Sequence, residues 1–305
     1  MWLVLAIFSA VLLGCYDSFK KEALRENAVI PILFLNTLFC SIIFLPFILL
    51  SYTTTSLDGT IFHVSSGGWE VHKYIVLKSC IVLSSWIFGY FGMKHLPLTI
   101  VGPINATRPV MVLIGALLVF GEKLNMYQWI GVILAVLSFF LLSRSGKKEG
   151  IDFKHDKWIY FIILAALLGA ISGIYDKYLM ASSADGGVGL DRMIVQSWYN
   201  IYQCFLMGIV LLFLWWPTRK KTTPFRWQWS IVFISLFLSA ADFVYFYSLS
   251  LPGALISIVS MIRRGSVVVS FLFGAMLFHE KNLKSKVVDL GLVLLGMFFL
   301  YIGSK

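Results

Sequence analysis

YFGMKHLPLTIVGPINATRPVMVLIGALLVFGEK, residues 90–123, is a segment apolar enough to cross a lipid bilayer, but it carries Arg108 near its middle. A charged side chain at that depth costs about 2.5–3.5 kcal/mol on insertion scales, so it normally faces the protein interior or a water-filled cavity. Arg108 is therefore expected at a functional centre of the molecule.

The same segment recurs later in the chain as YFYSLSLPGALISIVSMIRRGSVVVSFLFGAMLFHEK, residues 245–281. Six landmarks match in order, which is not expected by chance. They pair Tyr90 with Tyr245, Phe91 with Phe246, Pro97 with Pro252, Arg108 with Arg263, Glu122 with Glu280, and Lys123 with Lys281. A further match joins Gly14-Cys15-Tyr16-Asp17 to Gly173-Ile174-Tyr175-Asp176. The chain is therefore built from two related halves.

The composition places the chain among integral membrane proteins. Of its 305 residues, 59% are hydrophobic and 13% are charged, and the mean hydropathy is +0.86, whereas soluble domains carry about 25% charged residues. The net charge of +10 lies in short clusters between apolar segments, so the lipid bilayer, and not nucleic acid, is the expected partner. The four cysteines lie in apolar segments without CxxC spacing, so no disulfide, metal site or cofactor is expected.

Apolar windows of membrane length predict an all-α integral membrane fold with ten transmembrane helices. The windows are residues 2–20, 29–51, 74–93, 97–120, 127–143, 157–180, 191–216, 227–249, 252–278 and 284–303. Two directly joined copies of a five-span unit must insert in opposite orientations. We therefore expect two inverted five-helix repeats, residues 1–145 and 156–305, connected by residues 146–155. Such an architecture is typical of secondary transporters.

Basic residues gather in the connectors that follow odd-numbered spans. Among them are Lys20, Lys21, Arg25, Lys94, Arg144, Lys147, Lys148, Arg219, Lys220, Lys221 and Lys286. The positive-inside rule then places these connectors in the cytoplasm and both termini outside. The expected location is the inner membrane of the cell.

Each half has a helix that opens at Leu-Pro, passes a polar mid-membrane position and ends in Glu-Lys. In this the chain resembles, over essentially its whole length, the EamA type of the drug/metabolite transporter superfamily. The resemblance implies a basket of ten helices with a central cavity lined by spans 1, 3, 4, 6, 8 and 9, spans 5 and 10 being peripheral. Basic residues at both symmetric positions, Arg108 and Arg263, are unusual for that family and are expected to mark the substrate.

The two symmetric arginines are the leading candidates for substrate contact. If a pseudo-two-fold axis brings them together, they offer planar, bidentate donors for carboxylate or phosphate. Alternatively, each arginine is neutralised by an internal carboxylate and only braces the bundle; the candidates are Asp17, Asp176 and Asp242. Arg264 lies about 100° from Arg263 on a helix, so one of the two is expected to face the cavity and the other a neighbouring helix.

Three other residues close to Arg108 in the same span carry predictions of their own. Asn105 lies three residues earlier on the same helix face, where it either completes a polar recognition surface or forms an interhelical hydrogen bond. Pro103 and Pro109 remove backbone donors and predict a hinge or break in this helix.

Tyr16-Asp17 and Tyr175-Asp176 fall near the ends of spans 1 and 6, which the inversion places toward opposite faces. They are expected to form gate ion pairs with Lys20 and Lys177 or to act as proton-coupling carboxylates; the alternative is an ordinary interfacial role. Asp242 lies deeper in span 8, and Ile87 occupies its place in the first half. Asp242 is therefore the better candidate for an arginine partner or proton site.

Aromatic residues on spans 3 and 8 are expected to wall the substrate pocket, although aromatic side chains there also serve helix packing. They are Trp86, Tyr90 and Tyr245. Glu122 and Glu280, each beside a lysine at a helix end, are interpreted as structural.

The chain is expected not to be an enzyme, because it contains no HExxH, GxSxG or Walker A motif. The predicted function is secondary active transport of a small polar, anionic metabolite, coupled to protons or to exchange, by a monomer or homodimer. Two alternatives stay open. One is a lipid-linked sugar flippase of the same fold, and the other is a membrane assembly subunit without transport, in which the arginines are fully salt-bridged.

Overall fold

The structure is a computed structural model that describes residues 2–108, 110–111, 125–147, 151, 153–180, 187–249, 251, 259, 262–277 and 283–303. Every regular element within these residues is a helix. They are α1 (Trp2–Leu24), α2 (Val29–Thr53), α3 (Trp69–His95), α4 (Leu98–Ala106), α6 (Met126–Lys147), α7 (Lys157–Met180), α8 (Arg192–Val210), the π-helix η2 (Leu211–Trp215), α9 (Ser230–Leu249), α11 (Ser266–Met276) and α12 (Leu283–Gly303).

Several helix ends follow directly from the sequence. The Asp191 carboxylate caps α8, because it accepts hydrogen bonds from the backbone N–H groups of Met193 at 2.7 Å and Ile194 at 3.4 Å. Pro97, whose ring fixes φ near its observed −63°, immediately precedes α4. Helices α3 and α6 run several residues past the predicted spans 74–93 and 127–143, because a helix continues through polar residues that an apolar window excludes.

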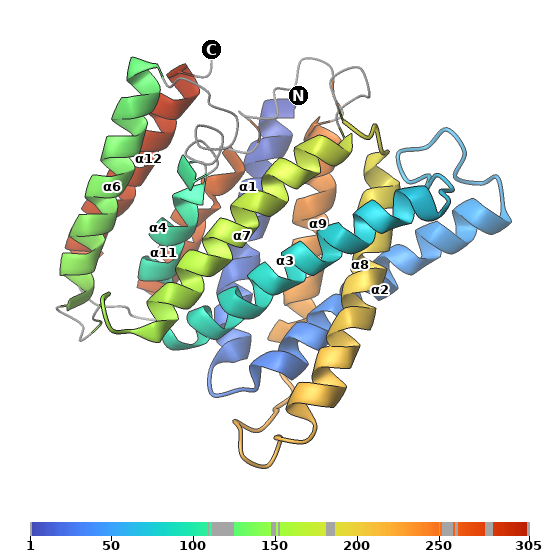
Figure 1. Ribbon diagram of the computed structural model, residues 1–305, viewed down its shortest axis with the longest axis horizontal. Helices are drawn as coiled ribbons and strands as arrows, with labels where there is room; N and C mark the ends of the chain where they lie inside the picture. The colour runs from blue at the N-terminus through green and yellow to red at the C-terminus, as the bar shows by residue number, and fades with distance from the viewer. Residues whose placement is uncertain are drawn as a thin grey trace.

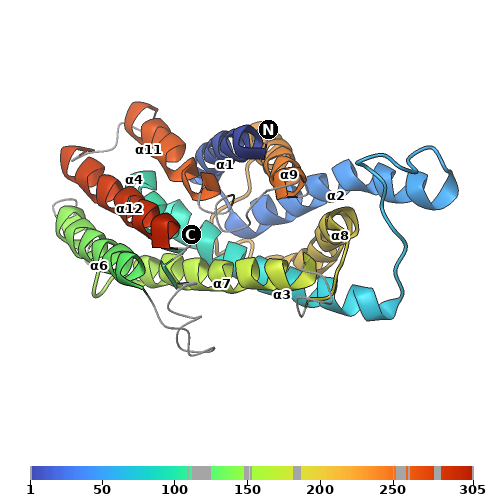
Figure 2. The ribbon, with the colours of Figure 1, turned by 90° about the horizontal axis from the view of Figure 1, so that it is seen from above.

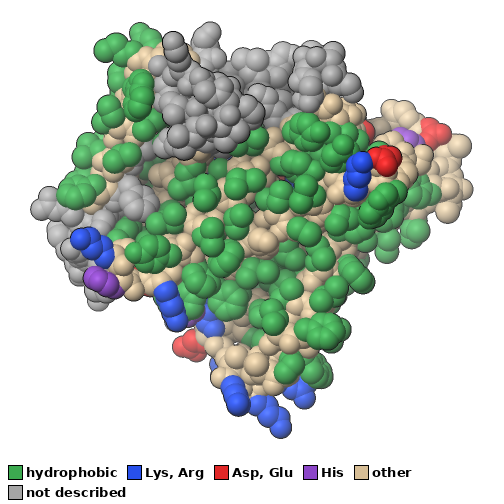
Figure 3. Space-filling view, viewed as in Figure 1, with side chains coloured by type: hydrophobic (Ala, Val, Ile, Leu, Met, Phe, Trp, Pro, Cys, Tyr) green, Lys and Arg blue, Asp and Glu red, His purple; other side chains and the backbone are tan. Residues whose placement is uncertain are grey.

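The helices alternate in direction between two ends of the molecule (Figure 1). Both termini lie at the upper end of the figure, and the connections that follow α1, α3, α6 and α8 lie at the lower end. Within the described residues, seven helices are long and apolar enough to cross a membrane. Figure 3 shows hydrophobic side chains over the middle of one face and Lys and Arg side chains toward its lower end. This distribution suits a bundle surrounded by lipid and ended by polar loops.

The contacts between helices follow the two-fold relation between the halves. Helices α1, α2, α3 and α6 correspond in sequence order to α7, α8, α9 and α12. Helix α1 packs on α9 and α3 packs on α7, while α2 packs on α8 and α6 on α12. Exchanging the halves converts the α1–α9 contact into the α3–α7 contact and maps the α2–α8 and α6–α12 contacts onto themselves. Figure 2 shows α3 and α7 along one side, α1 and α9 along the other, and α6 with α12 at one end.

Close contacts between the halves rest on small residues and serine hydroxyls. Ser9 of α1 donates a hydrogen bond to the Ala241 carbonyl of α9 at 2.7 Å, and Ser85 of α3 donates one to the Ala165 carbonyl of α7, also at 2.7 Å. Such interhelical bonds contribute about 0.6 kcal/mol each on average in membrane proteins. They therefore fix register more than they supply stability.

Both helices that carry a symmetric arginine are interrupted beside it. Helix α4 ends at Ala106 with a turn at Thr107, whose hydroxyl donates to the Ile104 carbonyl at 2.7 Å. In the second half a turn at Gly265, whose N–H donates to the Ile262 carbonyl at 2.8 Å, precedes α11. The first break falls between Pro103 and Pro109, as their sequence positions predict. The second corrects the expectation of one uninterrupted helix over residues 252–278.

Candidate functional site

Arg263 lies in the short helical stretch before Gly265 and forms an ion pair with Asp242 of α9. The two side chains are only 16% and 11% exposed. The other carboxylate oxygen of Asp242 accepts a hydrogen bond from the Tyr199 hydroxyl of α8 at 2.9 Å. The ring of Tyr245 lies 4.3 Å from the guanidinium carbon of Arg263, a cation–π distance. The structure thus confirms Asp242 as an arginine partner.

Arg108 has a different environment from its symmetric counterpart. Its Nη2 donates to the Asn105 side-chain oxygen at 3.0 Å, while its buried Nε has no hydrogen-bond partner. The guanidinium lies against α7, where a Cβ added to Gly169 would be 2.7 Å from the arginine Cζ. Asp17 attracts Arg108 electrostatically, but no carboxylate in the described part of the chain forms an ion pair with it.

Arg264 adds a further positive charge to the centre. The side chain is half-buried and follows Arg263 directly in the chain. Among the residues that the structure describes, no carboxylate forms an ion pair with Arg264. Of the two adjacent arginines, Arg263 therefore faces α9, and Arg264 makes no ion pair with a described carboxylate.

A second polar cluster joins α1 and α3. Asp17 forms an ion pair with Lys20 at 2.7 Å, and these side chains are 19% and 9% exposed. The Lys20 ammonium lies 4.2 Å from the ring centre of Tyr16 and 5.2 Å from that of Tyr90. The two tyrosine hydroxyls are 3.4 Å apart and hydrogen-bonded. The expected partner of Asp17 is confirmed, and the pair lies within a single helix.

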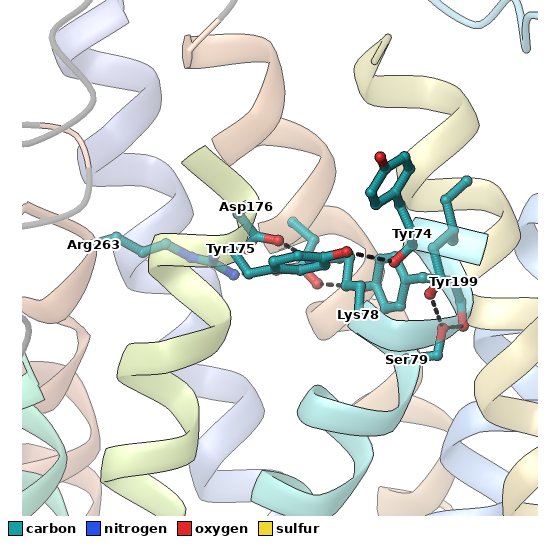
Figure 4. A network of polar contacts seen from close by, with 9 residues as sticks. Tyr74, Lys78, Ser79, Tyr175, Asp176, Tyr199 and Arg263 are labelled. Atoms are coloured by element: carbon teal, nitrogen blue, oxygen red, sulfur yellow. Dashed lines mark hydrogen bonds and ion pairs between the residues drawn. The ribbon is translucent and has the colours of Figure 1, made fainter. Parts of the chain in front are cut away.

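A third cluster joins α3 to α7 (Figure 4). Lys78 of α3 forms an ion pair with Asp176 of α7, and the side chains are 4% and 19% exposed. Beside it, the Tyr175 hydroxyl donates to the Tyr74 carbonyl at 3.3 Å. The sequence predicted Lys177 as the partner of Asp176, but Lys78 takes that place; the Lys177 side chain lies outside the described residues. This cluster connects a first-half helix to a second-half helix.

Comparison with known proteins shows to which family the chain belongs. The model of the EamA-like transporter family matches residues 1–144 and again residues 156–302. The chain belongs to the EamA-like transporter family. Membership of the drug/metabolite transporter superfamily follows, and the apolar helices of the described residues make the chain a multi-pass membrane protein.

The individual proteins that resemble this chain share little sequence identity with it. An uncharacterized transporter from Archaeoglobus fulgidus is 23% identical over 155 residues, and the alignment covers 50% of each chain. The chain thus spans about half the length of the curated relative it matches. A protein of known crystal structure has a TM-score of 0.64 and 12% identity, with 98% of this chain and 96% of the other covered. At this identity the likeness concerns the fold alone.

The structure brings most of the residues singled out from the sequence of this EamA-like protein into these clusters. Trp86 is the exception: it packs partly buried against the core beside Ile87. Glu122 and Glu280 lie outside the described residues. Sequence reasoning missed Lys78 and Tyr199, although a lysine inside a predicted span was a usable signal.

Proposed function

We propose that this EamA-like protein is a secondary active transporter of a small polar anion that works by alternating access between its two halves. The observation that carries the proposal is the pair of central guanidiniums, Arg108 and Arg264, that have no carboxylate partner among the described residues. Uncompensated charges within a membrane bundle are costly. A bound anion removes that cost and gains charge-assisted hydrogen bonds.

In this proposal the chain crosses the membrane ten times, as two inverted five-helix repeats. The directions of the described helices support it, because α3 ends at the lower end of the bundle and α6 begins at the upper end, whereas α9 ends at the upper end and α12 begins at the lower end (Figure 1). The basic loops after α1, α3, α6 and α8 face the cytoplasm, in the inner membrane of the cell.

The proposed substrate contacts come from both halves. Arg108, with Asn105, and the arginines of the second half bind the anionic group, while Tyr90, Tyr245 and Trp86 form the apolar walls. Gating or coupling to protons or exchange involves the remaining polar residues, which are Asp17, Asp176, Asp242, Tyr16 and Tyr175. We propose no chemical conversion of the substrate.

Removing the Arg108 charge is expected to abolish stabilisation by anions. Ligand at 100 times its dissociation constant stabilises the native state by about 2.7 kcal/mol, which a thermal unfolding assay detects. A panel of carboxylates, phosphates and neutral metabolites is tested on the wild type, Arg108→Ala and, as a matched control, Arg226→Ala in an exposed loop. Anions should stabilise the wild type and the control but not Arg108→Ala. Stabilisation by neutral compounds alone, or an unchanged response of Arg108→Ala, contradicts the anionic substrate.

Gly169→Ala is expected to have a similar effect on anion binding without removing any charge. A Cβ at Gly169 would lie 2.7 Å from both Cζ and Nη1 of Arg108, so the guanidinium must move. Because a side-chain end can swing aside, the stability cost should be near the low end of overpacking, about 1 kcal/mol. Gly173→Ala, one turn later in α7, is the control, since an added Cβ there meets nothing within 4 Å. If anions stabilise Gly169→Ala and Gly173→Ala equally, Arg108 is not part of the anion-binding site.

A further inference from the structure

The loop between α2 and α3, residues 54–68, places a phenylalanine ring between two helices. The Phe62 ring stacks on Phe47 of α2 and on Phe243 of α9, with the ring centres 5.3 Å apart and the planes tilted by 11° in both pairs. Separations of about 4.5–7 Å are those that stacked aromatic rings prefer. The loop therefore joins α2 to α9 through a sandwich of three nearly parallel rings.

Hydrogen bonds hold this loop against the bundle on both sides of its buried anchor, Val64, which is 1% exposed. The Val64 N–H donates to the Ser51 hydroxyl at 3.0 Å. The Tyr52 hydroxyl donates to the Ser65 carbonyl at 3.4 Å. These contacts fix the position of the loop around Phe62.

Arg192, the first residue of α8, fastens the loop to α9. Its Nη2 donates to the Ile61 carbonyl, beside Phe62, at 2.9 Å. Its guanidinium carbon lies 5.6 Å from the ring centre of Phe243 and 5.2 Å from that of Tyr247, distances at which a cation is attracted to an aromatic face. One guanidinium thus contacts both the loop and the α9 side of the ring sandwich.

The ring sandwich borders the central ion pair. Phe243 directly follows Asp242, which pairs with Arg263, and the loop lies at the end of the bundle opposite the basic connections (Figure 1). Ser239 lies one turn before Phe243 on the same face of α9 and is 7% exposed. A small molecule that enters between α2 and α9 from the loop side must pass the Phe62 ring to reach this depth.

The corresponding connection of the second half, residues 216–229, docks on the opposite end of the bundle. The Asn27 amide donates to the Arg226 carbonyl at 2.7 Å, and its side-chain oxygen accepts from the Arg226 N–H at 2.9 Å. The Lys94 ammonium donates to the Thr223 hydroxyl at 2.8 Å. Each half therefore supplies a loop that closes over one end, and alternating access requires that the two ends open in turn.

We propose that Phe62 is the gate residue at its end of the transporter, and that the α2–α3 loop withdraws this ring from between α2 and α9 before the central site opens to that side. This inference rests on the alternating access of the proposed function. A stacked aromatic pair shifts an equilibrium about 2- to 10-fold, so two such pairs favour the closed form about 5- to 100-fold. Closure is then the dominant state and remains reversible.

The gate is tested by the reaction of a cysteine behind it with a membrane-impermeant maleimide. Ser239→Cys is made after the four native cysteines are replaced by alanine, and the reagent is applied to intact cells and to inverted membrane vesicles. Labelling follows the population of the open form when the loop opens and closes faster than the reagent reacts. Phe62→Ala should therefore speed labelling at least about fivefold from the loop side, and the rate from the opposite side should not rise.

Three further variants separate the gate from a general loss of packing. Phe62→Tyr keeps the stacked ring and should label within about twofold of the protein with Phe62. Arg192→Gln leaves the sandwich intact but removes its fastening, so it should speed loop-side labelling about 2- to 5-fold. The matched control is Phe19→Ala, because the Phe19 ring of α1 packs on two rings nearer the other end of α9, 5.1 Å from Phe233 and 5.3 Å from Phe237. It should leave loop-side labelling unchanged.

An unchanged loop-side rate in Phe62→Ala overturns the gate, because the ring then does not limit access. An equal rise from both sides also overturns it, because the substitution then loosens the whole bundle. Both results leave anion transport standing, since the labelling assay needs no substrate. Failure of the anion panel to stabilise the wild type contradicts the proposed function instead, whatever the labelling rates are.

Discussion

Asp242→Ala is expected to lower the free energy of unfolding by about 3–5 kcal/mol, because it leaves Arg263 buried without its carboxylate. The ion pair is shielded, with side chains 16% and 11% exposed, so water cannot replace the lost partner fully. The variant also removes the acceptor of the Tyr199 hydroxyl, which donates to Asp242 at 2.9 Å. Thermal or denaturant unfolding of the purified protein in detergent measures the loss.

A double variant that removes both charges distinguishes two quantities. One is the loss of stability when Arg263 is left without a carboxylate, and the other is the net contribution of the ion pair to stability. Asp242→Leu with Arg263→Met should recover most of the lost stability, since apolar replacement of a buried ion pair is often neutral or stabilising. Asp58→Ala provides the control: its contact with His63, at 3.2 Å, is exposed, and such pairs contribute about 0–1 kcal/mol. If Asp242→Ala costs no more than Asp58→Ala, Arg263 has another source of compensation.

The fold was accessible from the sequence because its signals are periodic and repeated. The match of Arg108 to Arg263 and of Tyr16-Asp17 to Tyr175-Asp176 identified two halves, and an odd number of spans in each implied inversion. The observed pairing of α1 with α9 and of α3 with α7 is the exchange expected of two related halves. Asp242 was predicted to be an arginine partner or a proton site because it lies deep in an apolar span, where a charged residue needs a partner, and the structure shows its ion pair with Arg263.

The burial of the lysines was not accessible in the same way. Lys20 and Lys286 were counted as loop charges, yet their residues are 8% and 0% exposed, and Lys286 donates to the Thr99 hydroxyl at 2.7 Å. Lys78 was overlooked inside span 3. A lysine stem is long enough to reach a neighbouring helix or the interface, so only the tertiary arrangement decides where its ammonium lies. The helix break at Gly265 was not predicted, because no proline lies beside it as a sequence signal.

The ion pair between Lys78 and Asp176 has no equivalent at the other end of the molecule. The residue that corresponds to Lys78 is Phe233 of α9, whose ring centre lies 5.1 Å from that of Phe19 in α1. Asp17 instead pairs with Lys20 in its own helix. The halves are therefore joined by a buried charge pair where α3 meets α7 and by aromatic packing where α1 meets α9.

Asp176→Ala is expected to lower stability by about 3–5 kcal/mol, because Lys78 is only 4% exposed and would remain charged without a partner. It should also loosen the contact between α3 and α7 at the end opposite the basic loops. Reaction of Tyr74→Cys with a membrane-impermeant maleimide reports on that end, since the Tyr74 carbonyl accepts the neighbouring bond from Tyr175. Labelling should be faster when Asp176 is replaced, after correction for the four native cysteines in a Tyr74 background.

A double-mutant cycle decides whether this pair closes the molecule or only braces it. Lys78→Met, Asp176→Leu and their combination should give a coupling free energy near the upper end of the usual range for contacting residues, about 2–3 kcal/mol. The combined variant should regain stability but keep the altered labelling rate, because an apolar contact separates without returning two charges to water. If the combined variant regains both the stability and the labelling rate of the wild type, apolar packing is sufficient at this interface. The charge pair then has no part in opening that end.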